Sequence, residues 1–216
     1  SGEYLVTLGM KKESHLGGIA FDGENVWICH SNSNTLERIS YEYITKIAQD
    51  APEYCIDASA LSDEYRLKNT PSCITCYGGR LWVATHTSFF DSEMYSYSYD
   101  KKEDKLTAVS NYNLPSKVQG VAFDDNGSIY LSTSYGRNNS SYLKVYSSLL
   151  SLDKKPNEPK VKVEMPPCSE EVAIADGTVF VLFESASAKY FEGTDGMGKS
   201  PAPIDKLLEV SVASIW

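Results

Sequence analysis

Hydrophobic and polar residues alternate in short runs along this chain, and turn residues separate the runs. A period of two with many Val, Ile and Tyr residues is typical of β-strands, and stretches with the 3.6-residue period of amphipathic helices are scarce. Four segments share one pattern, in which a short strand and a tight Asp, Asn or Gly turn precede a strand with an aromatic residue between aliphatic ones. They are residues 18–28, 73–83, 120–131 and 171–181.

Equivalent positions in the four segments recur about every 50 residues, at Ile19, Ile74, Val121 and Val172. Further strands are expected after each hairpin, and about four antiparallel strands per repeat are typical of a β-propeller blade. We therefore predict an all-β propeller, in one domain of residues 1–216, with blade hairpins that begin near residues 18, 73, 120 and 171. A strand at residues 3–8 is expected to close the ring by completing the last blade. The alternative is a β-sandwich with coincidental hairpins.

Some of these residues resemble a known family. Residues 119–137 and 169–190, together with residues 15–20, resemble the small propellers of the NHL and gluconolactonase-like type. The closest resemblance is to a group of secreted bacterial propeller proteins without assigned activity, and it covers most of residues 15–208. Members of that group have five blades, so the resemblance implies a five-bladed plan of which four blades are visible here. It also implies an extracytoplasmic or secreted location, although the first residues show no signal peptide.

Charge and hydropathy narrow the range of partners. The 216 residues include 29 acidic and 20 basic ones, which gives a net charge of −9. This surplus of negative charge argues against nucleic acid as a partner. The uncharged apolar runs are shorter than the roughly 20 residues that span a membrane, so we expect no membrane insertion. A small polar ligand, a carbohydrate or a protein remains as the expected partner.

The geometry of a propeller predicts where a ligand would bind. The loops that enter the first strand of each blade, and those that leave the second strand, open on one face, here called the channel-mouth face. Its His, Gln, Tyr and Arg side chains can hydrogen-bond a polar ligand, and an arginine can hold a carboxylate or phosphate with two hydrogen bonds. The alternative is that these side chains cap strand ends and connect blades. The candidate ligand-binding residues are His15, His30, His86, Gln119, Tyr135, Arg137 and Tyr190.

Three acidic residues on the same face are the candidates for catalysis: Glu170, Glu171 and Glu184. A glycosidase would use two of them as acid and base, and a lactonase-like hydrolase would hold a divalent cation. Calcium takes six to eight oxygen ligands, and few acids stand near the repeated positions. We therefore expect no metal and no cofactor, with calcium as the alternative, and favour a ligand-binding or scaffold module over a hydrolase.

Cys73 and Cys76 have the spacing of a CxxC motif. They lie in a predicted strand, where residues three apart point to opposite faces, so they are poorly placed to form a zinc knuckle or a mutual disulfide. Alignment of the repeats predicts buried thiols at Cys29 and Cys76. A disulfide between Cys73 and either Cys168 or Cys55 remains open.

Overall fold

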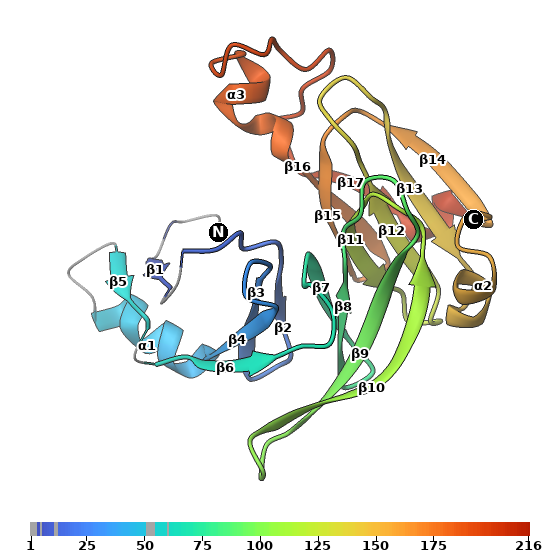
Figure 1. Cartoon of the computed structure of the whole chain (residues 1–216). Helices are drawn as coiled ribbons and strands as arrows, with labels where there is room; N and C mark the ends of the chain where they lie inside the picture. The colour runs from blue at the N-terminus through green and yellow to red at the C-terminus, as the bar shows by residue number, and fades with distance from the viewer. Residues whose placement is uncertain (1–3, 5, 11–12, 51–54, 60) are drawn as a thin grey trace.

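The computed structural model of the chain describes residues 4, 6–10, 13–50, 55–59 and 61–216. Most of the strands lie in four sheets, which follow one another around an arc as the blades of a β-propeller (Figure 1). Each blade begins with one of the four repeated hairpins. The all-β propeller predicted from the repeat is therefore confirmed.

Antiparallel pairing connects neighbouring strands within every blade. Blade one contains β2 (Ile19–Phe21), β3 (Asn25–His30), β4 (Thr35–Ser40) and β6 (Asp63–Arg66). Blade two contains β7 (Cys73–Tyr77), β8 (Arg80–Ala84), β9 (Ser92–Asp100) and β10 (Lys105–Leu114). Blade three contains β11 (Val118–Phe123), β12 (Ile129–Thr133), β13 (Ser141–Tyr146) and β14 (Val161–Met165). Blade four contains β15 (Ser169–Ala175), β16 (Thr178–Phe183) and β17 (Leu208–Ser211).

The extra residues of the first repeat form a small layer on blade one. Its members are β1, α1 and β5, and Leu8, Tyr43 and Ile44 pack there against the buried side chains of Ile28 and Ile39. Short helical segments lie outside the other blades. The bounds of these elements are β1 (Thr7–Gly9), α1 (Tyr41–Asp50), β5 (Cys55–Asp57), α2 (Leu149–Lys154), η1 (Glu184–Ala186), α3 (Ala188–Phe191) and α4 (Val212–Ile215).

The N-terminal strand has a different partner from the one expected. Residues 3–8 were expected to complete blade four, but Thr7–Gly9 pairs in parallel with Cys55–Asp57. The physical reason is that Leu8 and Met10 are apolar and bury their side chains against blade one. Residues 3 and 5 of the predicted strand lie outside the described residues.

Turn chemistry explains why the hairpins recur. The Asp22 carboxylate accepts hydrogen bonds from the backbone nitrogens of Glu24 (2.9 Å) and Asn25 (2.7 Å), and from the Trp27 indole (2.7 Å). In blade three the Asp124 carboxylate accepts from the backbone of Ser128 (2.9 Å) and from the Tyr130 hydroxyl (3.2 Å). In blades one and three the Asp therefore orders the turn and holds the aromatic ring, whereas in blade two the Trp82 indole donates to the Tyr77 carbonyl (3.0 Å).

Packing between blades follows the alternation of residues along the strands. The aromatic residue of the second strand faces the next blade and is buried, with 0% exposure for Trp27, 4% for Trp82 and 0% for Tyr130. The aliphatic residues of the first strand face the preceding blade. Ile74 is 2% exposed there, whereas the equivalent Ile19 of blade one is 63% exposed. Blade one therefore has a first-strand face that no preceding blade covers within the described residues.

The first strands of consecutive blades approach one another closely at the axis. β2 lies beside β7, β7 beside β11, and β11 beside β15. A Cβ atom on Gly120 would lie 2.5 Å from a carboxylate oxygen of Glu171 and 2.6 Å from the backbone nitrogen of Val172. A Cβ atom on Gly18 would lie 2.9 Å from the Cα of Cys73. Only glycine permits this approach, so these two positions set the spacing between blades.

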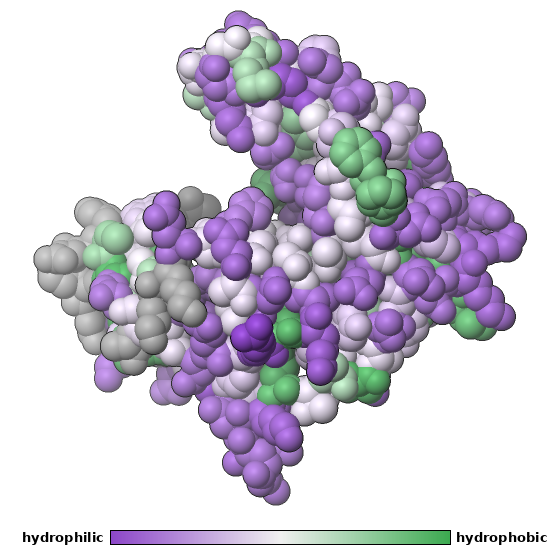
Figure 2. Space-filling view, viewed as in Figure 1, coloured by the Kyte–Doolittle hydropathy of each residue, from purple (hydrophilic) through white to green (hydrophobic). Residues whose placement is uncertain are grey.

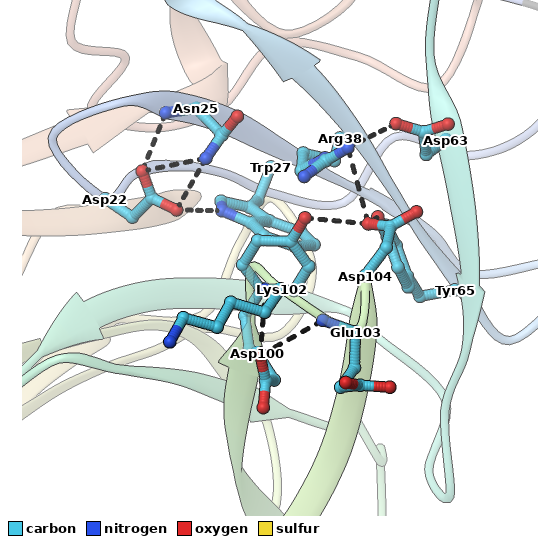
Figure 3. Close-up of polar contacts among 11 residues, drawn as sticks. Asp22, Asn25, Trp27, Arg38, Asp63, Tyr65, Asp100, Lys102, Glu103 and Asp104 are labelled. Carbon is cyan, nitrogen blue, oxygen red and sulfur yellow. Dashed lines mark hydrogen bonds and ion pairs between the residues drawn. The ribbon is translucent and has the colours of Figure 1, made fainter.

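A polar network connects blade one to the β9–β10 hairpin (Figure 3). The Asp104 carboxylate accepts hydrogen bonds from the hydroxyls of Tyr65 (2.5 Å) and Tyr99 (2.7 Å). The Arg38 guanidinium pairs with Asp63 and lies 3.5 Å from Asp104. Burial and the Asp104 carboxylate raise the pKa of Tyr65, so its hydroxyl stays a donor. The network holds the two blades together at the edge remote from the axis.

All five cysteines are free thiols. Cys29 is fully buried as expected, and Cys76 is half-buried. Cys73 forms no disulfide with Cys168 or Cys55. No helix among the described residues is long and apolar enough to cross a membrane.

Replacing Gly120 with alanine should destabilise the protein by about 1–3 kcal/mol, because the new Cβ must displace the backbone at Val172. Gly9→Ala is the matched control, since its Cβ would approach no atom closer than 3.4 Å. Urea denaturation, followed by tryptophan fluorescence, measures the free energy of unfolding of both variants. Equal stability of the two variants would contradict the proposed role of Gly120.

Candidate functional site

The loops that were predicted to share the channel-mouth face do lie together in each blade. The loop that follows the second strand donates a backbone N–H to the loop that enters the first. Ser31 donates to the His15 carbonyl (3.2 Å), and His86 donates to the Ser72 hydroxyl (2.9 Å). The same contact joins Ser134 to Lys117 (2.9 Å) and Glu184 to Cys168 (3.0 Å). A hydrogen bond between these two loops therefore recurs in all four blades, with a backbone carbonyl as acceptor in three and a serine hydroxyl in blade two.

Two acidic side chains and an amide come together at the start of blade four. The Gln119 amide donates to a carboxylate oxygen of Glu170 (3.3 Å). Burial, followed by the negative charges of Glu184 and Glu171 and a hydrogen bond to Glu184, raises the pKa of Glu170 to about 8. Glu170 therefore carries its proton over most of the neutral range. We call Gln119, Glu170 and Glu184 the mouth cluster.

Glu171 lies beside this cluster but has a different environment. Its carboxylate accepts hydrogen bonds from the backbone nitrogens of Val172 (3.0 Å) and Val121, so it connects β15 to β11. Burial raises its pKa to about 8 despite these bonds. Burial, with Glu171 as the next cause, also raises the pKa of the Cys29 and Cys73 thiols. These thiols are therefore neutral and unreactive at physiological pH.

Arg137 holds a segment of this chain. Its guanidinium donates to both carboxylate oxygens of Asp195 (3.1 and 2.5 Å) and to the carbonyls of Lys189 (3.0 Å) and Gly198 (2.5 Å). It also lies 4.8 Å from the centre of the Tyr190 ring. These hydrogen bonds hold the pKa of Asp195 at about 2. The arrangement matches the alternative in which Arg137 connects structural elements, because a ligand carboxylate would have to displace Asp195.

The three histidines have three different environments. His15 is exposed and offers its side chain to solvent. His86 is half-buried, with its Nδ1 atom 3.1 Å from the Val118 carbonyl. His30 is 2% exposed and its Nε2 atom lies 2.7 Å from a carboxylate oxygen of Glu37. His30 therefore faces Glu37 rather than the solvent.

A cavity of about 580 Å³ opens on the same face beside blade three. It is lined by Tyr135, which the sequence singled out, and by three lysines that it did not: Lys117, Lys144 and Lys162. The cross-strand pairing of Lys144 with Lys162 was the available signal, but it requires the register of β13 and β14. No group of three or more His, Cys, Asp or Glu residues in the described part of the chain is arranged to hold a metal. The ligand-binding roles of the candidate residues stay predictions.

Comparisons with known proteins assign no family to the chain. No protein-family model and no curated protein matches the chain. A solved nidogen/laminin complex is similar over 92% of this chain and 60% of its own, with 11% identity and a TM-score of 0.49. Streptogramin B lyase is similar over 80% of this chain and 49% of its own, with 13% identity and a TM-score of 0.45. Hydrazine synthase from Kuenenia stuttgartiensis is similar over 76% of this chain and 42% of its own, with 10% identity and a TM-score of 0.47. The chain thus spans roughly half the length of these structures.

The surface in view is mostly hydrophilic, with separate hydrophobic patches, and it is indented between the arm that carries α3 and the remaining blades (Figure 2). Arg137 is the side chain that anchors this arm through Asp195 and Gly198.

Arg137→Gln should loosen residues 188–200, because it removes the guanidinium that holds both Asp195 and Gly198. Proteinase K should then cut this segment several-fold faster than in the wild type, as measured by mass spectrometry of timed digests. Arg80→Gln, which changes an exposed arginine at the start of β8, is the control. Unchanged cleavage in Arg137→Gln would exclude the anchoring role.

The raised pKa values of Glu170 and Glu171, about 8 each, predict how stability depends on pH. The folded state binds more protons than the unfolded state between the ordinary glutamate pKa and about 8, so the free energy of unfolding should fall as pH rises through this window. Each group contributes at most about 1.4 kcal/mol per pH unit.

Glu171→Gln should flatten this dependence, because the amide keeps an acceptor oxygen for Val172 and Val121 and has no charge to bury. Urea denaturation at pH 5, 6.5 and 8 tests this, with Glu158→Gln as an exposed control. If the free energy of unfolding changes with pH equally in both variants, the Glu171 carboxylate is charged over the whole range from pH 5 to 8.

Proposed function

We propose that this protein is a bacterial, extracytoplasmic ligand-binding module of the NHL-type propeller class, which binds a neutral carbohydrate at the mouth cluster without a cofactor. The observation that carries the proposal is the combination of groups at one point. The carboxyl group of Glu170, whose pKa is raised to about 8, lies beside the Glu184 side chain and the Gln119 amide. Together they offer donors and acceptors, and sugar hydroxyls need both.

The neighbouring residues fit this proposal. The Lys189 ammonium lies 3.8 Å from a carboxylate oxygen of Glu184 and 4.4 Å from the centre of the Tyr190 ring. The Lys189 ammonium and the Tyr190 ring therefore border the cluster on the side of Glu184. An aromatic ring there can pack against the apolar face of a sugar. Both residues come from α3, next to Glu184 in η1.

The spacing of the acids favours binding over glycoside hydrolysis. The two carboxyl groups of a glycosidase stand about 5–9 Å apart so that the sugar and water fit between them. Glu170 and Glu184 interact directly enough for Glu184 to raise the pKa of Glu170, which favours a closer spacing than a glycosidase uses. The hydrolase alternative has one observation in its favour, since a carboxyl group with a pKa of about 8 is suited to act as a general acid.

Binding is tested by saturation-transfer NMR with maltose, cellobiose and N,N′-diacetylchitobiose at pH 7. At least one sugar should bind the wild type. Gln119→Ala should weaken its binding about tenfold, because it removes a donor next to Glu170. Glu103→Gln, at the exposed β9–β10 turn, is the control. EDTA should leave binding unchanged. Failure of all three sugars to bind would overturn the proposal.

The hydrolase alternative is tested with p-nitrophenyl glycosides. The binding module predicts no turnover above that of the buffer. Turnover that is lost in both Glu170→Gln and Glu184→Gln would replace the proposed function with a hydrolase.

A further inference from the structure

The lysine cavity beside blade three shares no lining residue with the mouth cluster. Its three lysines come from separate segments of the chain. Lys144 and Lys162 are directly opposite each other on β13 and β14, and Lys117 precedes β11. Serine, threonine and asparagine side chains complete the lining of the 580 Å³ space: Ser116, Thr133, Ser134, Asn139 and Ser140.

Among the described residues, the three lysines of this cavity form no direct ion pair with an acidic side chain. No ion pair found in the described part of the chain includes Lys117, Lys144 or Lys162. The nearest carboxylates have other hydrogen-bond partners, because Asp91 accepts from the Asn157 amide (3.0 Å) and Glu164 accepts from the Ser140 hydroxyl (2.6 Å). The charge of Asp91 offsets only part of the repulsion that Lys144 experiences.

Like charges directly opposite each other on neighbouring strands destabilise a sheet. Burial, and then the charges of Lys162 and Lys117, lower the pKa of Lys144. The three converging lysines are therefore an energetic cost that a bound anion would offset.

Aromatic rings hold the ammonium groups and extend the cavity on one side. The Lys162 ammonium lies 3.9 Å from the centre of the Tyr142 ring, and that of Lys117 lies 4.9 Å from the centre of Tyr135. Tyr135 in turn contacts Phe89, with ring centres 5.8 Å apart. Phe89 is 76% exposed, so the rim of the cavity presents an apolar surface next to the positive charges. Such a pair of features suits a ligand with an anionic group attached to a ring.

We propose that Lys117, Lys144 and Lys162 form a binding site for the phosphate, sulfate or carboxylate group of a sugar, and that the sugar ring lies against Phe89. Ammonium groups recognise such anions through charge-assisted hydrogen bonds, and the surrounding hydroxyl and amide groups can bind the remaining oxygens. The site is separate from the mouth cluster, so it stands or falls independently of the function proposed above.

The test is calorimetric titration of the full chain at low ionic strength with glucose 6-phosphate, glucuronate, glucose and inorganic phosphate. Glucose 6-phosphate or glucuronate should bind, and the one that binds more tightly identifies the anionic group. Lys144→Gln and Lys162→Gln should each weaken binding at least tenfold, and Phe89→Ala should weaken it several-fold. Lys102→Gln, at the exposed β9–β10 turn, should bind as the wild type does.

Stability provides a second measurement. Lys144→Gln removes charge repulsion within the cavity. Without a ligand, this variant should therefore fold and should have a higher Tm than the wild type. Gln119→Ala should leave the binding of glucose 6-phosphate unchanged, which separates this site from the mouth cluster. The proposal is overturned if neither anionic sugar binds the wild type, if the lysine variants bind as tightly as Lys102→Gln, or if inorganic phosphate binds as tightly as the sugars.

Discussion

The close approach of the first strands at the propeller axis determines the rest of this structure. Gly120 admits the backbone of β15, and the Glu171 carboxylate occupies the space next to it, where it accepts hydrogen bonds from both β15 and β11. An acid in that place loses its hydration, which raises its pKa to about 8. The same geometry places Glu170, one residue earlier, next to Gln119 of the neighbouring blade. The packing of the blades and the chemistry of the mouth therefore have one cause.

The two proposed sites contain ionisable groups of opposite charge, acids in one and lysines in the other. This difference follows from where their residues lie on the blades. At the mouth cluster, partly buried acids lie near the axis and burial favours their neutral form. In the lysine cavity, Lys144 and Lys162 lie opposite each other on the outer strands of blade three, and Lys117 reaches the cavity from the segment before β11. The first environment suits a neutral polyhydroxylated ligand, and the second suits an anion.

The blades could be predicted from the sequence because their causes are local. Asp22 and Trp27 are five residues apart, and the hydrogen bond between them lies within one hairpin. The partner of Arg137 could not be predicted, because Asp195 lies 58 residues away in a loop without a repeat. The partner of the N-terminal strand also depended on a non-local contact, in which Leu8 packs on Ile28 and Ile39. The lysine cavity needs the register of two outer strands, which hydrophobic periodicity does not specify.

The central claim is that partial burial at the axis keeps the acids of the channel mouth protonated near neutral pH. The most direct test is a ¹³C NMR titration of the glutamate side-chain carboxyl carbons, with Glu170→Gln and Glu171→Gln used to assign the two signals. The structure predicts that both titrate near pH 8. Titration of both near the ordinary glutamate value of about 4.3 would contradict this account of the axis and of the site built on it.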